Sequence, residues 1–143
     1  MFKSILLPVD LNEESSWRRA LPAALEQSRA QGASLHIVTV VPTFGLAMVS
    51  QFFPESYEER ILEHTDKELH AFVRAHVPTD MEAQTIVTSG NVYEEILRVA
   101  TEMSCDLIVM ASHRPKLRDY LLGPNAARVV RHATCSVLVV RGD

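Results

Sequence analysis

The sequence predicts a single α/β domain with a doubly wound sheet of five parallel strands and helices on both faces. Two observations carry this prediction. Short, continuous apolar runs, typical of buried parallel strands, recur along the chain. Amphipathic helical patterns separate them, so strand and helix alternate throughout. Right-handed crossovers between successive strands then place helices on both faces of the sheet.

Five apolar runs are expected to form the strands, and several end in a residue that interrupts the run. The expected strands cover residues 5–9, 35–41, 83–88, 107–110 and 137–140. Asp10 closes the first run, Pro42 the second and Gly90 the third. In open parallel sheets, ligands bind outside the carboxyl ends of the strands, so these ends are the candidate site.

Four segments have the helical spacing of apolar residues, at three and four positions apart. They cover about residues 15–30, 55–75, 92–103 and 124–132. Pro22 lies inside the first segment and should kink that helix or shift its start. Gly32 is a suitable residue to end it. Gly90-Asn91-Val92 could line a pocket, but a plain strand-to-helix turn is the preferred interpretation.

Length and composition fit one soluble domain. The chain has 143 residues, of which 47% are hydrophobic and 22% charged. The net charge of -4 argues against nucleic acid as a partner, because phosphate contacts need a basic face. Two cysteines, Cys105 and Cys135, are too few for a disulfide framework and are expected to be free thiols.

The sequence gives no indication of membrane insertion or export. No stretch approaches the roughly 18 apolar residues of a membrane span. The amino-terminal MFKSILLPVD lacks the apolar core and cleavage site of a signal peptide. A cytoplasmic protein is therefore expected.

The segment Phe44–Phe53 is irregular but rich in large apolar side chains. It could cover a pocket or form a contact between subunits, since exposed apolar patches often mark interfaces. A loop folded back on its own helix is an equally good interpretation.

Pro8-Val9-Asp10 ends the first strand, and Asp10 is a candidate ligand-binding residue. Its carboxylate could accept a hydrogen bond from a ribose hydroxyl or from the amino group of a base. It could equally accept from backbone N–H groups of the following loop, as Asp residues at strand ends often do. The residue type alone leaves both roles open.

The most specific pattern lies between residues 107 and 141. After the fourth strand, Met110 leads into a polar elbow, Ala111-Ser112-His113-Arg114, and Gly123-Pro124-Asn125 opens the last helix. Glycine lets backbone N–H groups approach a phosphate, and a helix N-terminus carries partial positive charge. The pattern therefore suggests a cradle for the phosphates of a nucleotide.

Two residues modify this cradle. The planar guanidinium of Arg114 can donate two hydrogen bonds to a phosphate. Pro124 lacks an N–H, but proline is well suited to the first position of a helix. The lost donor should weaken phosphate binding rather than abolish it.

These residues resemble the C-terminal signature of the universal stress protein family. Most ATP-binding relatives carry Gly-x-x-Gly, nine further residues and then Gly-Ser or Gly-Thr. Here Ala111 and Arg114 replace the first two glycines, the spacer is one residue shorter, and Pro124 follows Gly123. A subgroup of the family carries its own form of the motif, and this sequence matches that form at Ala111–Pro115, Tyr120–Gly123, Asn125–Ala127 and Val129–Ala133.

The resemblance covers essentially the whole chain and implies the strand order 3-2-1-4-5 with an ATP site at the carboxyl ends. The adenine would meet a main-chain group at Val40 or Val41, and the phosphates would lie on the elbow and the glycine turn, with or without Mg²⁺. The full set of residues that the resemblance implies for ATP is Pro8, Val9, Asp10, Val40, Val41, Met110, Ala111, Ser112, His113, Arg114, Gly123, Pro124, Asn125, Ser136 and Val137.

The last strand, Val137–Val140, would be a bare apolar edge in an open sheet. Pairing with the same strand of a second subunit around a two-fold axis would cover it. Relatives dimerise in this way, so the resemblance implies a homodimer, with a tetramer as the alternative. It also implies a regulatory protein partner such as a membrane transporter.

No catalytic or metal-binding motif accompanies this pattern. The sequence has no HExxH, no Gly-x-Ser-x-Gly and no P-loop. The expected function is an ATP-binding regulatory or stress-response module, in which the nucleotide state tunes oligomerisation and partner binding. The alternatives are a slow nucleotide hydrolase and a dimeric scaffold that binds no nucleotide.

Overall fold

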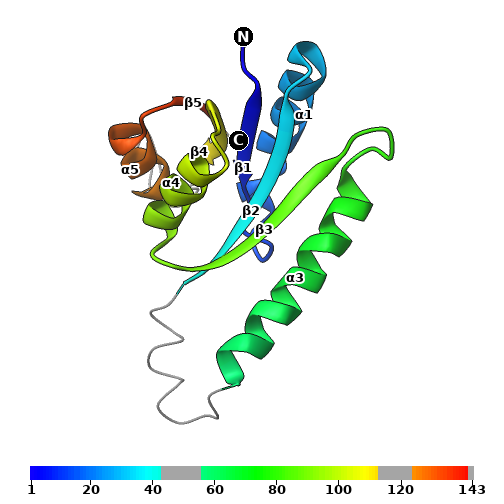
Figure 1. Ribbon diagram of the computed structural model, residues 1–143, viewed down its shortest axis with the longest axis vertical. Helices are drawn as coiled ribbons and strands as arrows, with labels where there is room; N and C mark the ends of the chain where they lie inside the picture. The colour runs from blue at the N-terminus through cyan, green and yellow to red at the C-terminus, as the bar shows by residue number, and fades with distance from the viewer. Residues whose placement is uncertain (43–55, 113–123, 142–143) are drawn as a thin grey trace.

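The computed structural model describes residues 1–42, 56–112 and 124–141. Its strands form one parallel sheet in the order β3-β2-β1-β4-β5, which confirms the predicted fold class and strand order (Figure 1). The strands are β1 Ser4–Pro8, β2 Ser34–Pro42, β3 Ala83–Gly90, β4 Leu107–Ser112 and β5 Ser136–Arg141. Some strands run one or two residues beyond the predicted ends because pairing continues there, as between Pro42 and Gly90.

Helices cover both faces of this sheet. In Figure 1, α1 and α3 lie on one side of the strands, and α4 and α5 lie on the other. The helices are α1 Ala20–Gln31, α3 Tyr57–His76, α4 Val92–Glu102 and α5 Pro124–His132, with a short 3-10 helix, η1, at Glu14–Ser16.

The first helix begins later than the sequence predicted. Residues 14–16 form η1, and α1 starts only at Ala20, so that Pro22 lies in its first turn. Proline has no N–H to donate, and only the first turn of a helix leaves that group unused. Of the two predicted effects of Pro22, the shifted start is therefore the one observed. Gly32 ends the helix at a φ of 64°, as expected.

The core has two layers, one on each face of the sheet. On β1, Ile5 and Leu7 pack beneath α1 and α3, and Leu6 between them packs beneath α4 and α5. All three side chains are fully buried. This alternation explains why the strand is a continuous apolar run.

Only the second half of α3 is anchored in this core. Its buried residues are Leu69 and Phe72, although the helix has 20 residues and is therefore about 30 Å long. The first half of α3 lies beside the end of β3, where the Ser89 hydroxyl donates to Glu58 at 3.3 Å. It forms an outer wall there, and this wall shapes the site described below.

The cysteines are free thiols, as predicted. Burial raises the pKa of both Cys105 and Cys135, which favours the protonated, less reactive form. Within the described residues, no helix is both long and apolar enough to cross a membrane. The predicted segment Phe44–Phe53 lies outside the part of the chain that the structure describes.

One histidine is buried in the sheet. His36 of β2 is 6% exposed, and its ring atom Nδ1 has no hydrogen-bond partner among the described residues. Burial lowers the pKa of His36, and a hydrogen bond with the side chain of Gln84 only partly offsets this effect. The folded protein therefore holds this ring in its neutral form.

This burial should make stability depend on pH. The unfolded chain binds a proton at His36 below about pH 6.5, and the folded state binds it only at a lower pH. The free energy of unfolding should therefore fall as the pH drops below about 6.5, by up to about 1.4 kcal/mol per pH unit, until the folded pKa is reached. Urea titrations between neutral and mildly acidic pH measure this slope.

The matched variants are His36→Leu and His64→Leu. The first should remove this pH dependence, while the second, at a side chain that is 75% exposed, should keep it. An unchanged slope in His36→Leu would show that other groups cause the acid sensitivity.

Candidate functional site

A cavity of about 610 Å³ opens at the carboxyl ends of β1, β2 and β4. Small-molecule pockets commonly have volumes of about 300–1,000 Å³. The cavity lies at the end of β1, which has β2 on one side and β4 on the other. The strand order reverses here, because β2 and β3 follow on one side of β1 and β4 and β5 on the other. This is the place at which open α/β sheets bind their ligands.

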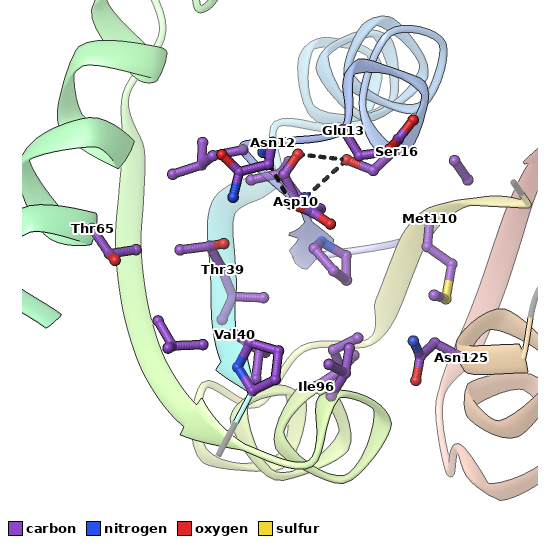
Figure 2. Close-up of a pocket in the computed structure, with 18 of the residues that line it drawn as sticks. Asp10, Asn12, Glu13, Ser16, Thr39, Val40, Thr65, Ile96, Met110 and Asn125 are labelled. Atoms are coloured by element: carbon purple, nitrogen blue, oxygen red, sulfur yellow. Dashed lines mark hydrogen bonds between the residues drawn. The ribbon is translucent and has the colours of Figure 1, made fainter. Parts of the chain in front are cut away.

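Asp10 lies beside this cavity, at the end of β1 (Figure 2). Its Oδ1 accepts a hydrogen bond from the N–H of Asn12 at 3.0 Å, so the backbone role considered from the sequence is present. Among the described residues, the other carboxylate oxygen has no hydrogen-bond partner. Asp10 can therefore stabilise its loop and still accept a hydrogen bond from a ligand.

Ser16 fixes the loop after Asp10 through two hydrogen bonds to the backbone of Asp10. The Ser16 hydroxyl accepts from the N–H of Asp10 at 2.8 Å and donates to its carbonyl oxygen at 3.0 Å. The next residue, Trp17, packs edge-on against Phe72 of α3 with 5.0 Å between ring centroids. This contact holds the loop that forms one rim of the cavity.

The end of β2 offers backbone groups to the cavity. β1 stops pairing at Pro8, opposite Val38, whereas β2 continues along β3 as far as Pro42. The carbonyl oxygen of Val38 faces β1, because it accepts from the N–H of Val9 at 2.8 Å. Alternate residues of a strand direct their backbone groups to the same side, so the N–H and C=O of Val40 face the space beyond β1.

Apolar side chains surround this backbone edge. Val40, Ile96 of α4 and Met110 of β4 line the cavity on the same side of the sheet (Figure 2). An apolar slot with one backbone donor and one backbone acceptor suits a flat heterocycle with hydrogen-bonding groups at its edge.

The N-terminus of α5 forms the other end of this slot. Pro124 is the first helical residue, as predicted, and Asn125 and Ala126 follow it along the cavity wall. The first turn of α5 contains no acidic residue, so its partial positive charge is not neutralised. The Asn125 side chain has no hydrogen-bond partner in the described ranges, and Figure 2 shows it beside Met110. An anionic group would be stabilised here.

The charged side chains of the described lining are mostly acidic. Asp10, Glu13 and Glu68 line the cavity, and Nε2 of His64 lies 2.5 Å from Oε1 of Glu68. These acids lie on the loop after β1 and on α3, away from the start of α5. The cavity is therefore polarised, with hydrogen-bond acceptors at one end and a helix N-terminus at the other.

Comparison with known proteins identifies the family. The model of the universal stress protein family matches residues 1–141. The chain belongs to this family. Universal stress protein G of Salmonella typhimurium is 31% identical over 143 residues, which cover 99% of this chain and 100% of that relative.

Solved structures agree with the fold of this family member. The protein MJ0577 superimposes with a TM-score of 0.76 at 23% identity and covers 100% of this chain and 98% of its own. A universal stress protein in complex with cAMP superimposes with a TM-score of 0.62 at 22% identity, covering 99% and 98% of the two chains.

The structure brings together most of the site residues predicted from the sequence of this universal stress protein. Those that line the cavity are Pro8, Val9, Asp10, Val40, Val41, Met110, Ala111, Pro124 and Asn125. Ser112 ends β4 and is not part of the lining. His113, Arg114 and Gly123 lie outside the described residues.

Two predicted residues lie at the wrong end of the sheet for this cavity. Ser136 and Val137 begin β5 and pair with Leu107 and Ile108 at the start of β4. In a parallel sheet, all strands begin at one end of the sheet and finish at the opposite end. The structure therefore places Ser136 and Val137 away from the cavity.

The sequence did not indicate the wall formed by α3. Ile61, His64, Thr65 and Glu68 line the cavity from this helix. One signal was available, because Thr65 is a polar residue within the apolar stripe of the helical pattern. In the described part of the chain, no group of three or more His, Cys, Asp or Glu side chains could hold a metal ion.

Proposed function

We propose that this protein binds an adenine nucleotide, ATP, in the cavity and acts in the cytoplasm as a nucleotide-dependent regulatory module. One observation carries the proposal: a single cavity joins an apolar slot with a free backbone edge at Val40 to the N-terminus of α5. A base needs the first feature and a phosphate the second. A family relative in complex with cAMP supports the same ligand class.

The nucleotide would lie along the slot. Its base would contact the backbone of Val40 and the side chains of Ile96 and Met110. A ribose hydroxyl would donate to Asp10, and the phosphates would approach Asn125 and the N–H groups at the start of α5. His113, Arg114 and Gly123 are the sequence-based candidates for further phosphate contacts, and Mg²⁺ would offset part of the phosphate charge.

The first test uses protein purified without added nucleotide. Denaturing it and identifying the released small molecules by chromatography and mass spectrometry should give ATP near one per chain. Release of ADP or AMP would favour the slow hydrolase instead. If nothing is released and calorimetric titration with ATP detects no binding, the dimeric scaffold is the better description.

We further propose that β5 forms a homodimer interface. β5 pairs with β4 on one side and is an edge strand of the sheet. Leu138 on this strand and Val130 on the neighbouring α5 are among the exposed large hydrophobic residues, at 37% and 44%. Pairing with a second copy would cover these groups. Light scattering with and without ATP should give the mass of two chains or more, and a monomer would contradict the proposal.

The regulatory role would act through this assembly. A nucleotide bound at the strand ends would alter the affinity of the dimer for a protein partner, for which a membrane transporter is the candidate. Co-purification with and without bound ATP distinguishes this role from that of a passive scaffold.

A further inference from the structure

The cavity extends further than the proposed nucleotide position. Thr39 and Val40 are consecutive residues of β2, so their side chains point to opposite faces of the sheet, yet both line the cavity. Val40 faces α4, whereas Thr39 faces α3, like Ile37 in the same strand. The cavity therefore wraps around the end of β2 and has a second lobe between this strand and α3.

Figure 2 shows this arrangement. Thr39 and Thr65 lie on one side of the β2 ribbon, and Met110 and Asn125 lie on the other. The α3-side lobe, defined here by Leu11, Asn12, Thr39, Ile61 and Thr65, lies beyond the slot proposed for the nucleotide.

Two hydroxyl groups in the α3-side lobe have no hydrogen-bond partner among the described residues. Thr39 is only 5% exposed, but its hydroxyl is not among the described buried atoms that lack a partner, so the oxygen remains accessible from the cavity that Thr39 lines. Thr65 is on a helix, where a threonine commonly donates to the carbonyl oxygen four residues earlier. Thr101 of α4 does so, to Leu97 at 3.1 Å. Thr65 does not, so its hydroxyl remains available to a ligand.

The chemistry of the lobe favours an uncharged ligand with hydroxyl groups. The Thr39 and Thr65 hydroxyls and the Asn12 amide can each donate and accept, as ligand hydroxyls do. The carboxylate of Glu68 at its edge is already paired with His64. No lysine or arginine occurs in the described lining, so an anion would find neither of these cations here, and Glu68 already occupies Nε2 of His64.

We propose that the α3-side lobe is a second subsite, which binds a neutral, polyhydroxylated small molecule of the sugar or polyol class beside the nucleotide. Leu11 and Ile61 would pack against the carbon skeleton of this ligand, while Thr39 and Thr65 would bind its hydroxyl groups. The subsite goes beyond the proposed function, because its binding groups do not include Val40, Met110 or Asn125.

The experiment is a titration of the ¹³C-labelled threonine methyl groups, followed by NMR. The probes are D-ribose, D-glucose, myo-inositol and glycerol, each added with and without ATP. At least one probe should shift the methyl signals of Thr39 and Thr65 in a saturable manner. The variants are Thr39→Val and Thr65→Val, which keep the shape of the side chain and remove its hydroxyl. Thr101→Val is the matched control.

Each lobe variant should weaken binding of the active probe by about threefold to tenfold, as expected for one lost neutral hydrogen bond, and Thr101→Val should not. The affinity for ATP should stay within about twofold in all three variants, well below the effect of a lost hydrogen bond. The proposal is overturned if no probe shifts these methyl groups. It is equally overturned if the lobe variants weaken ATP binding as much as probe binding, because the lobe would then belong to the nucleotide site.

Discussion

Replacing Asn125 with Asp is expected to weaken ATP binding at least about tenfold without destabilising the fold. The new carboxylate would face the phosphates at the start of α5. Two unit charges 4 Å apart interact by about 4 kcal/mol at an effective dielectric constant of 20. Solvent and counterions reduce this repulsion, and a loss of about 1.4 kcal/mol already corresponds to tenfold weaker binding.

The same substitution should not harm the helix. Asn125 is in the first turn of α5, which has no acidic residue, and a carboxylate there interacts favourably with the helix dipole. Stability should therefore stay constant or rise by a few tenths of a kcal/mol, while the affinity falls. This opposite response separates an effect on the ligand from an effect on folding.

The matched control is Asn91→Asp. Asn91 is the N-cap residue of α4, does not line the cavity, and Asp and Asn are about equally good in that position. Calorimetric titration should give the same ATP affinity for Asn91→Asp as for the wild type. Equal affinities for Asn125→Asp and the wild type would mean that the phosphates do not approach α5.

Replacing Gly90 with Ala is expected to lower the free energy of unfolding by about 2–3 kcal/mol. Gly90 has a φ of 150°, which residues with a side chain rarely adopt. An added Cβ would lie 2.7 Å from Cγ of Glu95. Both the backbone strain and this close approach act against the substitution.

Glu95 cannot easily move away from the added atom. Its Oε1 accepts a short hydrogen bond from the Thr88 hydroxyl and also accepts from Arg98 Nη2 at 2.8 Å. The neighbouring guanidinium of Arg98 is the main reason that the pKa of Glu95 lies below its usual value. Displacing this carboxylate would weaken the network that joins the end of β3 to α4.

Gly32→Ala provides the comparison. Gly32 also has a positive φ, 64°, but an added Cβ would have nothing within 4 Å. The free energy of unfolding of Gly32→Ala should therefore fall by only about 1–2 kcal/mol, the cost of the left-handed conformation. Urea midpoints at constant m-value measure both variants. If Gly90→Ala is no less stable than Gly32→Ala, Glu95 adjusts freely, and the close approach contributes nothing.

The sequence by itself determined the order of elements and several of their ends, because these depend on neighbours along the chain. Pro124 begins α5 as predicted, since proline fits the first helical position. Gly32 ends α1 through its positive φ. The alternation of apolar strands and amphipathic helices was sufficient for the parallel sheet with helices on both faces.

Only the tertiary structure decided the shape of the cavity. The backbone of Val40 is free on the side that faces β1, because β1 pairs with β2 only as far as Val38, whereas β3 pairs with β2 as far as Pro42. These pairings depend on which strands are neighbours in the sheet. The wall that contains Thr65 exists because α3 is anchored through Leu69 and Phe72 and continues to the end of β3, where Glu58 contacts Ser89. Ser136 and Val137 were predicted near the ligand but lie at the amino ends of the strands, opposite the cavity. A periodic pattern specifies which face of an element is buried, whereas a cavity depends on distances between elements that are far apart in the chain.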